Sequence, residues 1–248
     1  MISIVCATNN RKILEEQLKK SLDIQEYKDY ELIIIDTTKN KFESAADALN
    51  SCINRVSGEY ILFTHHDVVM RKKDDLEKIV KNIKKLDDFG IAGVIGRDIN
   101  GNFVGNITNG EPEVKVADND IKMSQEVQTL DEVIFIIKKE TLKKYPLETT
   151  NKTWHLYAVE YCLKMRELNK KVYVIPCEIY HKSAGASMNK SYYNELKRLC
   201  KMYKKNIKII NTTMGIWHTN EILLEIDIIK IKIILKIMKI KRKLLRNI

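Results

Sequence analysis

The stretch YILFTHHD, residues 60–67, has an unbroken apolar run that ends at Phe63, and after Thr64 come three polar side chains, His65, His66 and Asp67. A run of four apolar residues is too short for a typical helix and is characteristic of a strand that is buried on both faces. Such strands belong mainly to parallel sheets, whose ligands bind beyond the carboxyl ends of the strands. The stretch therefore predicts an α/β fold with a binding site at the His-His-Asp turn.

Apolar runs and helical patterns alternate on both sides of this stretch. Further strands are expected at 2–7, 32–35, 91–95, 133–137 and 172–175, and helices at 12–22, 44–56, 75–86, 154–168 and 192–203. This alternation predicts a mostly parallel sheet with right-handed crossovers and flanking helices. We expect one domain over 1–205, with a β-rich insert at about 97–130, and a basic helical tail over 206–248.

The charge of the chain is unevenly distributed. Residues 221–248 contain eight lysines and arginines against three acidic residues, and so carry half of the net charge of +10. The remainder of the chain is only mildly basic, which argues against nucleic acid as a partner. A basic module that binds nucleic acid or membrane through its tail is still one of the functional hypotheses.

Cysteine usage and the amino terminus indicate a cytoplasmic protein. The five cysteines are an odd number and include no Cys-x-x-Cys pair, which is typical of buried thiols in a reducing compartment. The first apolar run ends at Ala7, too early for a signal peptide, and no apolar stretch is long enough to span a membrane.

Polar side chains close three of the expected strands and should converge at one edge of the sheet. They are Thr8 and Asn9, then Asp36, then the His-His-Asp turn. Asp36 could accept hydrogen bonds from a base or a ribose, and Asp67 with a histidine suits Mn²⁺ or Mg²⁺ bridging phosphate oxygens. The alternative is that Asp36 merely caps a turn, which is the commoner role of an aspartate at a strand end.

Several segments, in this order along the chain, resemble family 2 glycosyltransferases with the GT-A fold. They are SIVCATNN (3–10), IIID (33–36), SAADALN (44–50), SGEYILF (57–63) and the turn at 65–67. The later segments VQTLDE (127–132), HLYAVEYCL (155–163) and HKSAG (181–185) are similar to the streptomycin-biosynthesis type within that group. The resemblance covers roughly residues 2–190.

The resemblance implies a metal and donor site. Asp67 would be the main metal ligand, with His65 and His181 completing the set. The donor, a nucleoside-diphosphate sugar that is most often UDP-linked, would be bound by the following residues: Thr8, Asn9, Asp36, Asn50, His65 and His66. The resemblance also implies catalytic roles for Asp131, near the sugar and acceptor, and for the acidic helix position Glu160.

The resemblance breaks at Ala158, which stands where the family has its base aspartate. Inverting transfer needs a carboxylate to receive the proton of the acceptor hydroxyl. Glu160, Asp131 or Glu132 could supply it, and the sequence leaves the choice open. It also leaves open a catalytically impaired protein that binds nucleotide sugar or acts as a scaffold. In isolation, Glu160 reads as a solvated helix acid paired with Lys164.

Residues 221–248 are expected to form a basic amphipathic helix. An isoleucine-rich face lies opposite polar positions; its members are Ile222, Ile226, Ile229, Ile233, Ile237, Ile240 and Leu244. The helix could dock on an anionic membrane at the inner face of the cell, or pack on this domain or on a partner chain. We predict a metal-dependent inverting glycosyltransferase of surface glycan synthesis, with a glycan or lipid-linked acceptor; the sequence leaves a homo-oligomer open.

Overall fold

The computed structural model describes residues 1–39, 42–183 and 188–245. Its centre is a sheet in which most strands are parallel, while β11 and β9 run antiparallel to their neighbours. The order across the sheet is β2 (Tyr30–Asp36), β1 (Ile2–Thr8), β3 (Tyr60–Thr64), β11 (Ile134–Lys138), β5 (Phe89–Gly93), β12 (Lys171–Val174) and β9 (Gln125–Glu126). The mixed α/β class predicted from the sequence is confirmed.

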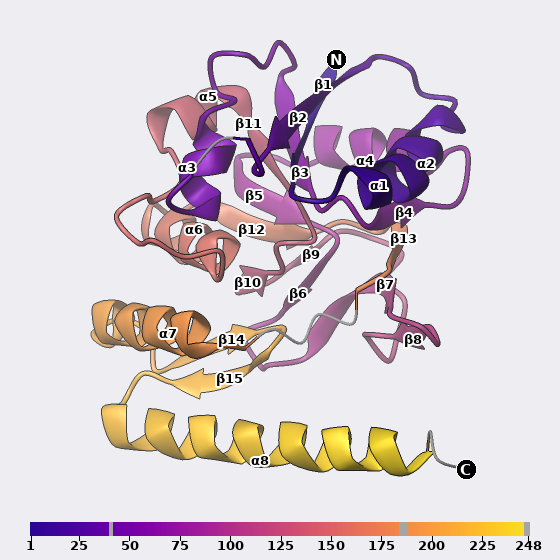
Figure 1. Ribbon diagram of the computed structural model, residues 1–248. Helices are drawn as coiled ribbons and strands as arrows, with labels where there is room; N and C mark the ends of the chain where they lie inside the picture. Colours follow the sequence, from indigo (N-terminus) through magenta and orange to yellow (C-terminus); the bar gives the residue numbers. More distant parts are fainter. Residues whose placement is uncertain (40–41, 184–187, 246–248) are drawn as a thin grey trace.

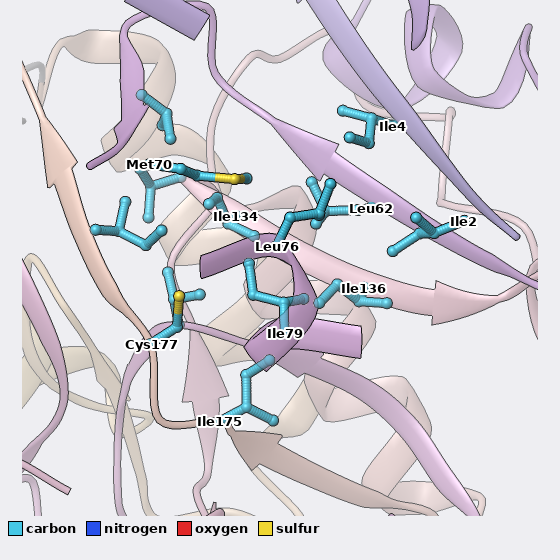
Figure 2. Close-up of a cluster of buried hydrophobic side chains, with 14 of the residues drawn as sticks. Ile2, Ile4, Leu62, Met70, Leu76, Ile79, Ile134, Ile136, Ile175 and Cys177 are labelled. Atoms are coloured by element: carbon cyan, nitrogen blue, oxygen red, sulfur yellow. The ribbon is translucent and has the colours of Figure 1, made fainter. Parts of the chain in front are cut away.

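Both faces of this sheet are covered, which explains why β3 is apolar at every position before Thr64. Leu62 points into one core with Ile4 and Ile136, and Figure 2 shows these side chains beside Leu76. That face is covered by α1 (Arg11–Leu14), η1 (Glu15–Lys19), α2 (Lys20–Asp23) and α4 (Asp75–Lys84). Phe63 points into the opposite core, under α3 (Ala45–Asn50), α5 (Lys139–Lys144) and α6 (Tyr157–Glu167). The period of two along each strand produces this division.

A second sheet crosses the carboxyl edge of the first. It consists of β10 (Thr129–Leu130), β6 (Ile95–Arg97), β7 (Phe103–Asn109), β13 (Glu178–His181) and β4 (Val68–Met70), with β8 (Val114–Lys115) beside β7. Strands β6, β7 and β8 account for much of the β-rich insert expected at 97–130. Strand β4 begins directly after the His-His-Asp turn, so this sheet lies next to the predicted site.

The C-terminal elements form a third layer beneath the sheets (Figure 1). This layer contains α7 (Lys190–Tyr203), the hairpin of β14 (Ile209–Thr212) and β15 (Gly215–His218), and α8 (Glu221–Leu245). Their core surrounds the fully buried Trp217. Within the described ranges, no helix combines the length and apolarity needed to cross a membrane.

Some elements differ from the sequence expectations. The tail expected to be helical from residue 206 first forms the β14–β15 hairpin and becomes helical at Glu221. The helix expected over 44–56 ends at Asn50, and a π turn, η1, interrupts the one expected over 12–22. Strands β4 and β13 were not expected, because their three and four residues are too short to show a period.

Gln128 attaches the C-terminal hairpin to the sheets. Its side-chain amide donates to the Ile209 carbonyl at 2.8 Å and accepts from the Asn211 N–H at 2.7 Å. Gln128 is 2% exposed, so water cannot replace these bonds. The next strand residue, Thr129, donates its hydroxyl proton to the Asn211 carbonyl. The hairpin is therefore held in place by polar contacts with buried partners.

We predict that Gln128→Ala lowers the free energy of unfolding by about 2–4 kcal/mol, because two buried backbone groups lose their partners. Urea denaturation followed by circular dichroism measures the change. Gln125→Ala, at an exposed position of β9, is the matched control and should change stability by less than about 0.5 kcal/mol. Equal effects of the two substitutions would contradict the anchoring role.

Candidate active site

Three side chains from two segments form a cluster that could hold a metal ion. His65, Asp67 and His181 each offer one ligand atom, and these atoms lie within 4.8 Å of one another. Nδ1 of His65 is 3.4 Å from Nε2 of His181, which in turn is 3.3 Å from Oδ1 of Asp67. The three residues that the resemblance implied as ligands are thus brought together.

The pairing of β4 with β13 creates this cluster. His181, the last residue of β13, is paired with Val68, the first residue of β4, so it lies beside Asp67. The Lys182 N–H donates to the Asp67 carbonyl at 3.0 Å, which extends the pairing by one step. The N–H of Ser183 donates to Oδ2 of the Asp67 carboxylate at 3.2 Å. The loop after β13 was expected to include Ala184 and Gly185, which lie outside the described residues.

The protonation states of the cluster suit metal binding. Burial lowers the pKa of His65, and the neighbouring His181 lowers it further. Burial acting alone would raise the pKa of Asp67, but the hydrogen bond and charge of His181 outweigh it and lower the pKa to about 2. At neutral pH His65 is therefore neutral and Asp67 ionised, as metal ligation requires.

The donor set fits a divalent cation of intermediate hardness. A carboxylate with two imidazoles suits Mn²⁺ better than Mg²⁺, which prefers oxygen ligands almost exclusively. Three protein ligands leave further positions for phosphate oxygens and water. His65, Asp67 and His181 would hold the ion, and the adjacent cavity would hold the phosphates that complete its coordination.

A cavity of about 650 Å³ opens beside this cluster. It is large enough for a sizeable ligand. Its walls come from the ends of β1 and β3, the loop before β11, the start of α6 and the β14–β15 turn. The lining includes Asn9, Thr37, His66, Asp131 and Glu132 as well as the three cluster residues. The cavity therefore lies beyond the strand ends, where an α/β sheet is expected to bind its ligand.

The predicted nucleoside-binding residues lie at or near one end of this cavity. Asn9 lines it, and the Thr8 hydroxyl is 2.9 Å from Nδ1 of His66, which also lines it. Asp36 lies just outside the lining, while its neighbour Thr37 is part of it. Hydrogen bonds from Thr38 and Arg11 lower the pKa of Asp36 to about 2, so this carboxylate is firmly ionised.

Two further predicted site residues, Asn50 and Glu160, lie outside the cavity lining, and their side chains bind partners elsewhere. The side chain of Asn50 donates to the Leu147 carbonyl at 2.8 Å and accepts from the Leu147 N–H at 3.1 Å, a contact that joins the end of α3 to the segment after α5. Glu160 is buried against α7, where its Oε1 is 2.6 Å from Nη2 of Arg198. Arg198 also pairs with Glu195.

Asp131 and Glu132 are adjacent in sequence but differ in surroundings. Asp131 accepts hydrogen bonds from the Val133 N–H, at 3.0 Å, and from the Thr213 hydroxyl. Burial, followed by the charge of Asp131, raises the pKa of Glu132 to about 8. Oε1 of Glu132 is buried and has no hydrogen-bond partner among the described residues.

Other lining residues were missed by the sequence reasoning. Trp154, half-exposed at the cavity mouth, presents an aromatic face of the kind that stacks on sugars and bases. Tyr157 lines the interior, and Thr213 and Met214 enter from the turn between β14 and β15. A tryptophan followed by a histidine just before a helix was the available signal for Trp154. Nothing local marked Thr213.

Solved structures of several glycosyltransferases share this fold. A mannosyltransferase from Pyrobaculum calidifontis, PcManGT, in complex with GDP-Man and Mn²⁺, is 13% identical with a TM-score of 0.57; the match covers 82% of this chain and 63% of that one. TarS from S. aureus (residues 1–349) with UDP-GlcNAc is 17% identical with a TM-score of 0.55, covering 80% and 65%. GalNAc-T7 with UDP, GalNAc and Mn²⁺ is 14% identical with a TM-score of 0.59, covering 82% and 47%.

These similarities place the fold with the GT-A glycosyltransferases. The chain matches less than two thirds of the length of each of these structures. No curated protein matches it by sequence. A family model matches residues 3–210, most of the chain, and the protein therefore belongs to the glycosyltransferase-like family. The relationship to family 2 glycosyltransferases predicted from the sequence is confirmed at this level.

We predict that His181→Ala weakens Mn²⁺ binding by more than about tenfold, because it removes one of three ligands. Isothermal titration with MnCl₂ at neutral pH measures the affinity. His218→Ala is the matched control, since His218 pairs with Asp227 outside the cluster, and its Mn²⁺ affinity should equal that of the unaltered chain. Unchanged binding in His181→Ala would remove His181 from the metal site.

Proposed function

We propose that this chain is a metal-dependent inverting glycosyltransferase that transfers a sugar from a nucleoside-diphosphate sugar to a hydroxyl acceptor. The observation that carries the proposal is the position of the His65–Asp67–His181 cluster. It opens into the same cavity as the nucleoside-side residue Asn9 and the carboxyl groups of Asp131 and Glu132. A cation site between a nucleotide-binding edge and a pair of carboxyl groups is what transfer from a diphosphate requires.

The cavity offers a place for each part of the donor. The nucleoside would lie over the ends of β1 and β2, near Asn9, Thr37 and the ionised Asp36, which can accept a hydrogen bond from a base or ribose. The diphosphate would lie at the cluster, where a divalent cation offsets the charge that develops on the leaving group. The sugar would then lie toward Asp131, with Trp154 at the cavity mouth.

Uridine diphosphate is the donor nucleotide that we favour, on the sequence resemblance to family members that use it. The similar structures include complexes with a UDP sugar and with a GDP sugar, so binding has to be measured with donors of both nucleotides. The His65-x-Asp67 triplet also supports a relationship to the streptomycin-biosynthesis type. Within this proposal the acceptor is a glycan or lipid-linked hydroxyl of surface glycan synthesis.

We predict that UDP and one or more UDP sugars bind in the presence of Mn²⁺, and that Asp67→Ala reduces this affinity by at least about tenfold, since the diphosphate loses its cation. Isothermal titration with UDP-N-acetylglucosamine, UDP-glucose and GDP-mannose, each with and without Mn²⁺, tests the expectation. Glu113→Gln, at an exposed site outside the cavity lining, is the control. Failure of every nucleotide sugar to bind would exclude the proposed function.

A non-catalytic nucleotide-sugar-binding protein is the second candidate, favoured by Ala158 at the implied base position. Binding experiments cannot separate the two candidates, because both require the donor site. Release of nucleoside diphosphate from a bound donor separates them. Mn²⁺-dependent release above the rate in buffer would support the enzyme, and its absence with every bound donor would support the second candidate.

We propose in addition that the protein works at an anionic membrane surface through α8. This helix has two apolar faces. Leu224 and Ile228 are buried against the C-terminal core. The other face is an exposed isoleucine stripe, defined as Ile222, Ile226, Ile229, Ile233, Ile237 and Ile240. An exposed apolar stripe of this kind contacts either a lipid surface or another protein.

Charge favours the lipid surface over a second copy of the chain. The exposed Lys230 and Lys236 flank the isoleucine stripe, so two copies packed stripe to stripe would bring like charges together. The acidic residues of α8 are turned toward the body instead: Glu225 pairs with Lys197, and Asp227 with His218. Lys239, Lys243 and Leu244 fall where side chains are not described, and Arg246 lies outside the described residues.

We predict that the protein binds vesicles containing 30 mol% anionic phospholipid and that Ile233→Glu weakens binding by about tenfold, since it places a carboxylate in the apolar stripe. Vesicle co-sedimentation measures the partition. Lys205→Gln is the control, because it lowers the net charge by the same one unit but does so at an exposed turn outside the stripe. A stable dimer in sedimentation, lost in Ile233→Glu without any vesicle binding, would assign the stripe to a second copy.

A further inference from the structure

The first turn of α6 lacks the carboxylate that the proposed glycosyl transfer needs, and the inference below rests on that proposed function. Ala158 lies in that turn, fully buried, where the resemblance expects the carboxylate that receives the acceptor proton. Its methyl group can neither accept nor donate a proton. If the chain transfers a sugar, another group beside the cavity has to perform this step.

Two of the nearby carboxyl groups are already engaged. Both oxygens of Asp131 accept hydrogen bonds, one from the Val133 N–H and the other from the Thr213 hydroxyl. Glu160 does not line the cavity, and Arg198 binds its Oε1. Asp131 is thus held in a fixed orientation, and Glu160 serves the attachment of α7 to α6.

Glu132 differs from both. It lines the cavity, and its Oε1 is buried without a hydrogen-bond partner among the described residues. A buried carboxyl oxygen without a partner costs about 1–3 kcal/mol, so it is uncommon unless a ligand completes it. An acceptor hydroxyl that donates to Oε1 would complete it.

The start of α6 orients this carboxyl group. The backbone N–H groups of Leu156 and Ala158 act on the Glu132 carboxylate and favour its ionised form, in opposition to burial. Leu156 has a φ of 62°, a left-handed conformation that is unfavourable for leucine and that occurs often at functional sites. Glu132 thus approaches, from the loop before β11, the same helical turn that contains Ala158.

We propose that Glu132 is the general base of this protein, and that it replaces in space the carboxylate missing at Ala158. The acceptor oxygen forms its bond to the anomeric carbon while its proton passes to the Glu132 carboxylate. The bond between that carbon and the diphosphate oxygen breaks, and its electron pair leaves with the nucleoside diphosphate. A pKa near 8, raised by burial, makes the ionised carboxylate a stronger base than an exposed glutamate.

The test uses donor cleavage, in which water serves as acceptor, so the natural acceptor need not be known. The full chain is incubated with Mn²⁺ and each of UDP-N-acetylglucosamine, UDP-glucose, UDP-galactose and GDP-mannose, and released nucleoside diphosphate is measured. Glu132→Gln should bind donor within about threefold of the unaltered affinity and cleave it about 100-fold more slowly. Glu140→Gln, at an exposed site on α5, is the matched control and should cleave at the unaltered rate.

Two rescue experiments distinguish a base from a structural residue. Azide attacks the anomeric carbon without losing a proton, so it should restore cleavage in Glu132→Ala, with a glycosyl azide as product, and should not restore it in Asp67→Ala. Returning a carboxylate to α6 in the double variant Glu132→Gln/Ala158→Asp should recover at least about tenfold of the lost rate, within the usual contribution of a base.

The results distinguish a failure of the Glu132 assignment from a failure of the proposed glycosyltransferase activity. If the unaltered chain cleaves none of the donors, the proposed enzyme activity is excluded, and the role of Glu132 as general base is excluded with it. If it cleaves a donor and Glu132→Gln cleaves equally fast, only the assignment of Glu132 is overturned. A Glu132→Ala protein that folds and binds donor but gains nothing from azide would also overturn it. Loss of cleavage confined to Glu160→Gln would assign the base to Glu160.

Discussion

The pairing of β13 with β4 is the contact on which the candidate site depends. It joins two distant segments of the chain, because His65 and His181 are 116 residues apart in sequence. Two backbone N–H groups that follow β13 also hold Asp67. The Lys182 N–H donates to its carbonyl, and the Ser183 N–H donates to its carboxylate. The positions of the candidate ligands are thus set by the pairing of two strands and by backbone N–H groups that follow β13, which define side-chain positions more closely than a flexible loop would.

Local patterns in the sequence predicted much of the fold and half of this site. The fully apolar β3 and the strands and helices around it follow from burial on two faces, which a single segment can reveal. His65 and Asp67 were found because they follow β3 directly. His181 required knowledge of the family, because β13 has four residues and its partner β4 has three, too few to show a period. Thr213 could not be predicted at all, since the β14–β15 hairpin reaches the cavity through long-range contacts made by Gln128.

The roles of Asn50 and Glu160 show a second limit of sequence reasoning. Both are polar residues on helices close to the site, yet each binds a partner away from the cavity. Most residues in the first turns of α6 are buried, because this helix packs against the sheet on one side and α7 on the other. Polarity alone therefore could not say which of its faces meets the cavity. A charged residue buried against another helix, as Glu160 is against Arg198, has the same sequence pattern as one that faces a ligand.

Under the proposed assignment, Glu132 supplies the carboxylate that position 158 lacks. Whether a carboxyl group can receive the acceptor proton depends on where its oxygens lie. The glutamate side chain is long enough to reach a helical turn from a neighbouring loop. Ala158 is fully buried in the core, and its backbone N–H favours the ionised form of the Glu132 carboxylate. Reading position 158 by itself suggests an inactive protein, whereas the three-dimensional arrangement returns a carboxylate to the same turn. Catalytic competence therefore has to be judged from the groups around the cavity, and Oε1 of Glu132 is a carboxyl oxygen of that lining that has no hydrogen-bond partner among the described residues.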